Sequence, residues 1–327
     1  MEIETQNLIR IFSLTALSFL VAILWTPLLT HFLYKYRIVK QLREKTWDGE
    51  PAKIFRRMHK NKSGTPTMGG LLVWLTAAIV TIVFNLSRSQ TWLPVFVLVA
   101  SGTLGLIDDY LNVRGAVRGL STRLKFIFQF LIAGSGAWWF YYKLGFSEIK
   151  IPGGEALGLP AVLDIGWVYI PLFILTVVFI TNAVNITAGL DGLSGGTLAA
   201  SFGAILGIAA VQGQVGIAAF AGTIIGALLA FLWFNIYPAR FFMGDTGAFA
   251  LGATLAVLAF LTNTVLLLPI IGFIFVVEAF SSLLQWASKR YFGRKIFLVA
   301  PLHHHFEAAG WPETKVTMRF WVVAFVT

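Results

Sequence analysis

Cysteine is absent from this chain of 327 residues, and charged side chains are scarce. Without cysteine the protein forms no disulfide and no thiolate metal site, and its redox compartment stays open. Charged residues make up only 12% of the chain and hydrophobic ones 57%, with a mean hydropathy of +0.78. This composition excludes an ordinary soluble domain and indicates an integral membrane protein.

Acidic residues are fewer than basic ones: the chain has 15 Asp and Glu against 25 Lys and Arg, which gives a formal net charge of +10. In a soluble protein such an excess would suggest a nucleic-acid partner. Here the loops carry it, and basic loops beside apolar segments are typical of membrane topology and of anionic lipid headgroups. We therefore expect membrane lipids as partners and no nucleic acid.

Apolar segments recur along the whole sequence at lengths that suit a bilayer. We expect ten spans, at residues 8–34, 68–86, 93–107, 124–142, 167–186, 193–211, 215–233, 249–261, 265–284 and 316–327. The last offers only about 18 Å of helix against a hydrocarbon core of about 30 Å. The expected fold is an all-α polytopic membrane protein, with residues 1–327 as a single domain.

The basic residues also predict the orientation. Of the 25 Lys and Arg, 20 lie in or beside the loops after the odd-numbered spans, and 3 lie in the other loops. The positive-inside rule places the first set in the cytoplasm, so ten spans leave both termini on the outer, periplasmic side. On that side, residues 146–164 alternate around Pro152-Gly153-Gly154 and predict a small β-hairpin.

Two adjacent acids, Asp108 and Asp109, close the third apolar run. Acids at membrane depth are rare and usually mark a functional site. On a helix neighbouring side chains diverge by about 100°, so we do not expect the pair to chelate one ion together. We expect one acid to face a substrate and the other a cation such as Lys125 or Arg123. The alternative is a solvated helix end.

The first cytoplasmic loop is basic and ends at Lys62, shortly before Gly69-Gly70. A cation beside glycines that let a ligand approach the backbone suits a phosphorylated substrate. Close packing of helices at the glycine pair explains the same residues equally well.

Three polar residues, Asn182, Asn185 and Asp191, lie at the cytoplasmic end of the fifth span among several glycines. Such a loop can aim backbone donors at a ligand. Glycine-rich junctions also occur as simple turns, and the pattern alone does not separate the two.

Asp245 lies in the loop between the seventh and eighth spans, with Thr246-Gly247 after it. It is either the N-cap of the next helix or a ligand for Mg²⁺, which typically takes one or two carboxylates together with substrate phosphates. Phe241 and Phe242 in the same loop offer a stacking surface for a base.

Three consecutive histidines, His303, His304 and His305, lie in the last cytoplasmic loop. Consecutive residues point apart on regular structure, which disfavours a zinc site and favours contacts to phosphate or pyrophosphate. Glu278 is the one acid inside an expected span, where it marks either a pathway or a bend of the ninth helix.

Five motifs in this order resemble those of the phospho-N-acetylmuramoyl-pentapeptide-transferase (MraY) family, within the polyprenyl-phosphate N-acetylhexosamine-1-phosphate transferases. They are Gly64-Thr-Pro-Thr-Met-Gly-Gly70, Asp108-Asp109-Tyr110, the stretch from Asn182 to Gly192, Phe242-Met-Gly-Asp-Thr-Gly247 and Leu302-His-His-His-Phe-Glu307. The unbroken histidine tract and Thr67-Met68 resemble the peptidoglycan branch more than the N-acetylglucosamine-1-phosphate branch.

The resemblance implies a Mg²⁺-dependent enzyme of the bacterial inner membrane, with ten spans, periplasmic termini and a cytoplasmic site. The implied reaction moves phospho-MurNAc-pentapeptide from UDP-MurNAc-pentapeptide to undecaprenyl phosphate, giving lipid I and UMP in peptidoglycan synthesis. A homodimer remains open. The motifs imply Asp245 as metal ligand, with Asp108 and Asp109 also catalytic. They imply that substrate binds at Lys62, Lys125, Asn182, Asn185, Asp191, Asn235, Phe242, Gln285, His303, His304 and His305.

One position departs from the family pattern, because Ala188 stands where these enzymes usually have Asp. A contact near the uridine or the metal is therefore missing or supplied otherwise. Two other functions remain in view at this point: a UDP-GlcNAc:polyprenyl-phosphate GlcNAc-1-phosphate transferase of the same superfamily, and a transporter. A transporter would want its charged groups at the midplane and repeated halves, whereas these acids gather at one face.

Overall fold

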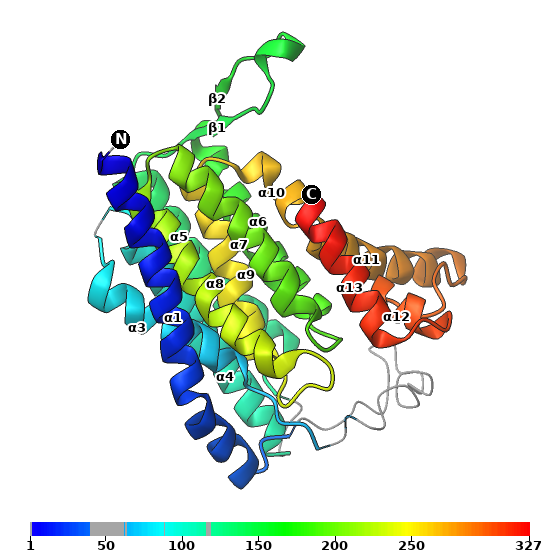
Figure 1. The fold of residues 1–327 in the computed structure, drawn as a ribbon. Coiled ribbons are helices and arrows are strands. Elements are labelled where there is room, and N and C mark those ends of the chain that lie inside the picture. The colour runs from blue at the N-terminus through cyan, green and yellow to red at the C-terminus, as the bar shows by residue number, and fades with distance from the viewer. Residues whose placement is uncertain (1, 40–61, 63, 88, 116–118) are drawn as a thin grey trace.

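The protein is described by a computed structural model covering residues 2–39, 62, 64–87, 89–115 and 119–327. Most of the first loop, between residues 35 and 70, lies outside the described residues. The chain is mainly helical (Figure 1). Its α-helices are α1 (Glu2–Lys35), α3 (Gly70–Phe84), α4 (Trp92–Val113), α5 (Thr122–Trp138), α6 (Tyr169–Thr187), α7 (Leu193–Val211), α8 (Val215–Asn235), α9 (Gly244–Leu261), α10 (Leu268–Ile271), α11 (Phe273–Phe292), α12 (Leu302–Ala308) and α13 (Glu313–Val326).

Among the described residues, 6 helices are long and apolar enough to cross a membrane, or 7 if one bent pair counts as a single span. Nine of the ten expected segments coincide with one principal helix each, although α3 (15 residues) and α13 (14 residues) are shorter than a full crossing requires. Helix α5 has 17 residues and continues directly into a π-helical turn at Trp139–Lys143. The helical, multi-span character predicted from the sequence is therefore confirmed.

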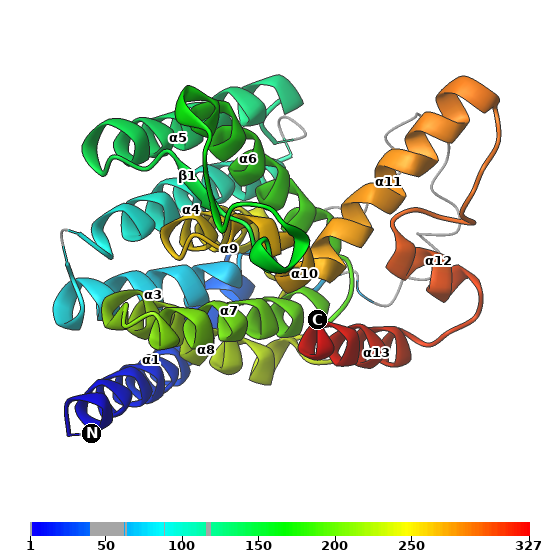
Figure 2. The ribbon, with the colours of Figure 1, turned by 90° about the horizontal axis from the view of Figure 1, so that it is seen from above.

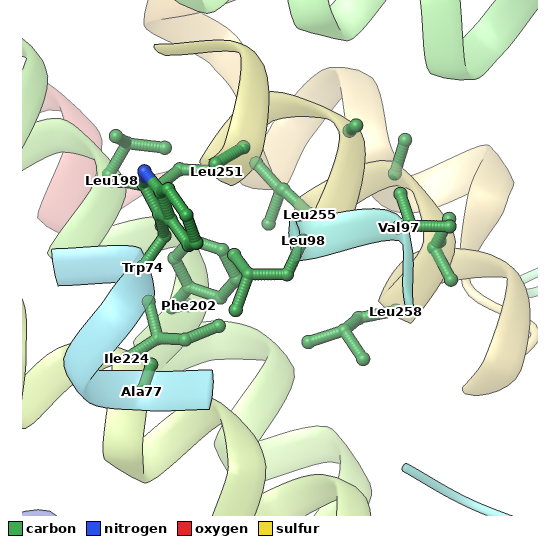
Figure 3. Close-up of a cluster of buried hydrophobic side chains, with 14 of the residues drawn as sticks. Trp74, Ala77, Val97, Leu98, Leu198, Phe202, Ile224, Leu251, Leu255 and Leu258 are labelled. Carbon is green, nitrogen blue, oxygen red and sulfur yellow. The ribbon is translucent and has the colours of Figure 1, made fainter. Parts of the chain in front are cut away.

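Helix α9 forms the centre of the bundle, and 94% of its 18 residues are buried. Its side chains Leu251, Leu255 and Leu258 meet Leu98 on α4 and Phe202 on α7 in a close-packed cluster (Figure 3). Gly105 of α4 permits this approach, because a Cβ there would overlap the backbone carbonyl of Asp245. The close contact of α4 and α9 brings the two acidic motifs together.

The expected ninth span, residues 265–284, is not one continuous helix. A short turn and α10 occupy Val265–Ile271, and α11 then leaves at an angle of 82° beyond Gly272. In both views α11 projects away from the bundle, beside α12 and α13 (Figures 1 and 2). The bend lies at Gly272, so Glu278 does not mark it.

The predicted hairpin is present. Strands β1 (Glu148–Lys150) and β2 (Val162–Asp164) pair antiparallel, with Glu148 opposite Asp164. The connection is longer than a Gly-Gly turn, because residues 151–161 include a helical turn at Glu155–Leu157. The hairpin and the N-terminus lie at the same end of the bundle (Figure 1).

Candidate active site

The acidic pair lies inside a helix, which corrects the expectation that it closes the third span. Helix α4 continues to Val113, and both Asp108 and Asp109 are fully buried. A solvated helix end is therefore excluded. Burying two carboxylates is costly unless each has partners, and the structure gives each acid a different set.

Asp108 is held from two sides by the segment that enters α5. Its Oδ1 accepts a hydrogen bond of 2.7 Å from the backbone N–H of Leu120. Its Oδ2 lies 2.6 Å from the ammonium of Lys125, which also lies 3.3 Å from Oδ2 of Asp245. The prediction that one acid would face Lys125 is confirmed, and the ammonium joins carboxylates from α4 and α9.

Asp109 instead stabilises the start of α9. Its Oδ2 accepts a hydrogen bond of 3.1 Å from the backbone N–H of Thr246, in the first turn of that helix. A carboxylate at this position also interacts favourably with the helix dipole. Gly244 leaves room for the contact, because a Cβ there would overlap the same carboxylate oxygen.

Asp245 belongs to α9 and not to the preceding loop, because the helix starts five residues before the apolar run. The N-cap position is Met243, whose own side chain makes no capping hydrogen bond. The alternative that Asp245 is merely an N-cap is therefore wrong. Only 6% of the residue is exposed, and its carboxylate faces Lys125.

A second charged cluster surrounds Lys62. Its ammonium lies 2.7 Å from Oδ1 of Asp191, forms a short ion pair with Glu313 and lies 5.7 Å from the centre of the Phe242 ring. Burial raises the pKa of the Glu313 carboxyl, against the opposing effect of Lys62. Sequence reasoning missed Glu313; its only signal was an acid at the start of the last helix.

Asn235 and Asp191 tie the loop before α9 to the loop before α7. The Asn235 side chain accepts from Gly192 N at 3.0 Å and donates to the carbonyl of Phe241 at 2.8 Å. Asp191 Oδ2 accepts from Ala239 N at 3.0 Å. The side chains of Asn235 and Asp191, both predicted site residues, therefore form hydrogen bonds with backbone groups of these loops.

The two loop phenylalanines differ in exposure. Phe241 is fully buried against Phe231, with ring centres 5.7 Å apart, so its predicted role in stacking is wrong. Phe242 is half-buried, and the ammonium of Lys62 lies 5.7 Å from the centre of its ring.

The histidine tract forms the first turn of α12. Nδ1 of His303 lies 2.8 Å from Oε2 of Glu278, and His304 lies 2.7 Å from Glu307. His305 accepts a bond of 3.2 Å from the backbone N–H of Leu298. The Nε2 atoms of His303 and His304 both approach Gly189 of the α6–α7 loop, where a Cβ would overlap His303 and crowd His304.

The remaining predicted residues lie apart from the Asp108–Lys125–Asp245 cluster. Asn182 donates to Gln129 of α5 at 2.8 Å, and Asn185 is half-buried on α6. Gln285 of α11 binds the backbone of residues 296 and 297 at 3.0 Å. Ala188 is half-buried at the C-terminal end of α6.

The buried histidine His304 predicts an acid-sensitive fold. Burial, and secondarily His303, lower its pKa from 6.5 to about 4. An unfolded chain takes up this proton below about pH 6.5 and the folded chain does not, so stability falls as the pH drops from 6.5 to 4. The full effect is about 3 kcal/mol. Thermal unfolding in micelles across this range should show the loss, and His304→Asn should flatten the curve.

The control for this measurement is His31→Asn, at an exposed histidine of α1. This variant should keep the wild-type slope. Equal flattening in both variants, or none in either, contradicts the assignment to His304.

Comparison with known proteins identifies the family of this chain. The model of glycosyl transferase family 4 matches residues 91–263, and signature 1 of the phospho-N-acetylmuramoyl-pentapeptide-transferases matches residues 62–72. The chain is 40% identical to the phospho-N-acetylmuramoyl-pentapeptide-transferase of Geobacillus thermodenitrificans, over 95% of this chain and 93% of the relative. Proteins of the same name from Bacillus subtilis (95% and 93% covered) and Chloroflexus aggregans (98% and 88% covered) are each 39% identical. The chain therefore belongs to the phospho-N-acetylmuramoyl-pentapeptide-transferase family.

Proposed function

We propose that this protein transfers phospho-MurNAc-pentapeptide from UDP-MurNAc-pentapeptide to undecaprenyl phosphate, releasing UMP and forming lipid I for peptidoglycan synthesis. The observation that carries the proposal is the cluster in which the half-buried Lys125 of α5 joins two buried carboxylates, Asp108 of α4 and Asp245 of α9. The names of the relatives and the signature at residues 62–72 support the peptidoglycan branch of the superfamily.

The proposed topology has ten crossings in one domain of the bacterial inner membrane, with periplasmic termini. In this topology α3, α5 and α13 each supply one crossing in addition to the 6 long apolar helices, and the bent pair α10–α11 supplies the last. Helix α5 leads into the hairpin, so Lys125 at its start and the hairpin lie at opposite ends. The basic loops lie on the Lys125 side, which supports a site that faces the cytoplasm.

The acidic cluster fits a Mg²⁺ ion. Two carboxylates from different helices already face one positive charge, the ammonium of Lys125. Mg²⁺ prefers carboxylate oxygens and usually takes only one or two in phosphate sites, the rest being water and substrate. No group of three or more acidic or histidine ligands is preassembled among the described residues, which agrees with substrate completing the sphere. Asp245 would hold the ion with Asp108 nearby, and the bound ion would neutralise the diphosphate charge.

The chain's own residues position the reactants, because exchange of one pyrophosphate bond for another requires alignment and charge neutralisation more than a covalent intermediate. A lipid phosphate has a second pKa near 6 and is largely a dianion at neutral pH. Its oxygen forms a bond to the β-phosphorus of the UDP-sugar while the bond from that phosphorus to the UMP oxygen breaks. Lys125 attracts the phosphate oxygens, and Asp109 keeps the start of α9 in place.

The nucleotide end of the substrate belongs near the second cluster in this proposal. The ammonium of Lys62, the Phe242 ring and the polar end of α6 offer charge, stacking and hydrogen bonds. His303 and His304 face the same loop from α12 and would contact phosphate oxygens. The Lys62 ammonium must leave Asp191 or Glu313 to reach a phosphate.

The proposed specificity is tested by offering UDP-MurNAc-pentapeptide and UDP-GlcNAc separately with undecaprenyl phosphate and identifying the lipid product. Only the first should give a lipid-linked diphosphate sugar, with UMP released in equal amount. A GlcNAc-diphosphate lipid would place the chain in the other branch of the superfamily. No lipid product from either sugar, in enzyme that binds both substrates, would contradict transfer altogether.

Direct attack predicts the behaviour of labelled UMP. Enzyme given UDP-MurNAc-pentapeptide, Mg²⁺ and labelled UMP should exchange no label until undecaprenyl phosphate is added, since no step releases UMP earlier. The enzyme must first be freed of endogenous lipid phosphate, which would permit reversal through lipid I. Exchange that persists in delipidated enzyme and disappears in Asp108→Asn would indicate a phosphorylated aspartate and ping-pong kinetics instead.

A further inference from the structure

A groove of about 780 Å³ lies between the C-terminal half of α1 and the end of α8, apart from the residues of the candidate active site. It is lined by Thr26, Pro27, Thr30, His31, Tyr34, Lys35, Phe234 and Arg240. None of these described lining residues carries a carboxylate. Two are permanent or near-permanent cations, so the groove is positively charged.

The two cations of the groove are exposed and held by aromatic rings. The Lys35 ammonium lies 5.8 Å from the centre of the Tyr36 ring, and the Arg240 guanidinium lies 5.7 Å from that of Phe234. Neither forms an ion pair with an acid in the described part of the chain. Cations that aromatic faces orient, and that have no acidic partner among the described residues, suit an anionic ligand.

The surroundings of the groove are those of a membrane interface. Leu24, Leu28 and Phe32 of α1 are 78%, 71% and 51% exposed, which suits contact with lipid tails. Trp233 and Tyr237 are 74% and 54% exposed beside the end of α8. Exposed Trp and Tyr next to basic residues are typical of the headgroup level. In the proposed orientation this is the cytoplasmic leaflet, where anionic lipids gather.

The groove is also joined to the loop that carries the active-site motif. The hydroxyl of Tyr34 donates a hydrogen bond of 2.8 Å to the backbone carbonyl of Arg240. In the same loop, Ala239 N binds Asp191 and Phe242 N binds the carbonyl of Pro66 at 2.8 Å. A ligand that fixes Arg240 would therefore steady the segment leading into Asp245.

We propose that this groove binds the phosphate of an anionic membrane phospholipid, with Lys35 and Arg240 as its cationic contacts and α1 supporting the acyl chains. The bound lipid is a structural ligand of the loop from Asn235 to Asp245 and not a substrate. The site needs both a phosphate and acyl chains, which distinguishes it from a site for a free anion.

The test uses the purified full chain in micelles, with phosphatidylglycerol and phosphatidylcholine as probes and native mass spectrometry to follow binding. Wild-type protein should bind phosphatidylglycerol more tightly than phosphatidylcholine. Lys35→Gln combined with Arg240→Gln should weaken phosphatidylglycerol binding by about 30-fold and leave phosphatidylcholine unchanged, since each cation contributes about a fivefold preference for an anionic surface. If the double variant fails to fold, each single substitution is tested instead and should weaken phosphatidylglycerol binding by about fivefold.

The matched control is Lys143→Gln, which removes a cation that also contacts an aromatic ring, that of Trp138 at 5.6 Å, at the hairpin end of the bundle. It should bind phosphatidylglycerol as wild type does. Inorganic phosphate at millimolar concentration should not displace the lipid. Equal losses in Lys143→Gln, or wild-type binding in the double variant, would overturn the proposal. Displacement by stoichiometric undecaprenyl phosphate would also overturn it, since the groove would then be an acceptor-lipid site.

Discussion

Asp245→Asn should lower turnover by about a hundred- to a thousandfold while the protein remains folded. The amide has nearly the shape of the carboxylate, and Lys125 keeps its contact of 2.6 Å with Asp108, so packing at the start of α9 survives. The charge that would hold Mg²⁺ and balance the diphosphate is lost, and preorganised charge of this kind typically supplies that much rate. Steady-state release of UMP at several Mg²⁺ concentrations measures the effect.

Asp164→Asn is the matched control for Asp245→Asn, because Asp164 is an exposed acid of the hairpin whose side chain bonds only groups near the hairpin, Gly166 N and the Ser147 side chain, in the part of the chain that the structure describes. It should retain wild-type turnover. Asp245→Asn turning over within a few-fold of wild type at ordinary Mg²⁺ would show that the metal ligand lies elsewhere.

The three histidines should separate when each is replaced by alanine. His303→Ala and His304→Ala should each lose turnover by about a hundredfold, because their Nε2 atoms face the α6–α7 loop and their other nitrogens are fixed by Glu278 and Glu307. His305→Ala should stay within a few-fold of wild type, since its side chain binds the backbone of Leu298 within its own segment.

Expression and melting temperature separate a site effect from lost folding in this series. His303 is fully buried against Glu278, so Glu278→Gln serves as the second measurement: it keeps an acceptor for the backbone N–H of His303 and alters only the partner of the ring. Reduced turnover in Glu278→Gln at wild-type melting temperature would assign Glu278 to positioning the ring. Three equally active histidine variants would mean that the tract is structural.

Long apolar runs made most of the helices predictable. Helix α7 begins and ends at the expected residues, Leu193 and Val211, because a glycine with positive φ lies just outside each end, Gly192 at 74° and Gly213 at 72°. Such residues interrupt a helix locally, so the sequence alone carries the signal. The break at Gly272 lacks that clarity, because the apolar run continues on both sides of it.

Boundaries set by distant contacts were not predictable. Hydropathy places the start of the eighth span at Phe249, yet α9 begins at Gly244, where the carboxylate of Asp109 receives a backbone N–H of its first turn. The same holds for the site. The pair Asp108–Lys125 spans 17 residues and was expected, whereas Glu313 reaches Lys62 across 251 residues. Charge neutralisation of that kind depends on the finished fold.

The central position of α9 also determines when packing of the helix bundle can be completed during synthesis. The helices that pack most closely on it, α3, α4, α6 and α7, all precede it in the chain. Because chains emerge from the ribosome N-terminus first, the helices that contact α9 are synthesised before α9 itself. The innermost helix is thus inserted after the helices that surround it, and the earlier helices do not assemble around it. A nascent chain stalled before Gly244 would leave the helix surfaces that pack on α9 uncovered and Lys125 without its contact to Asp245, which would make it a target for membrane proteases.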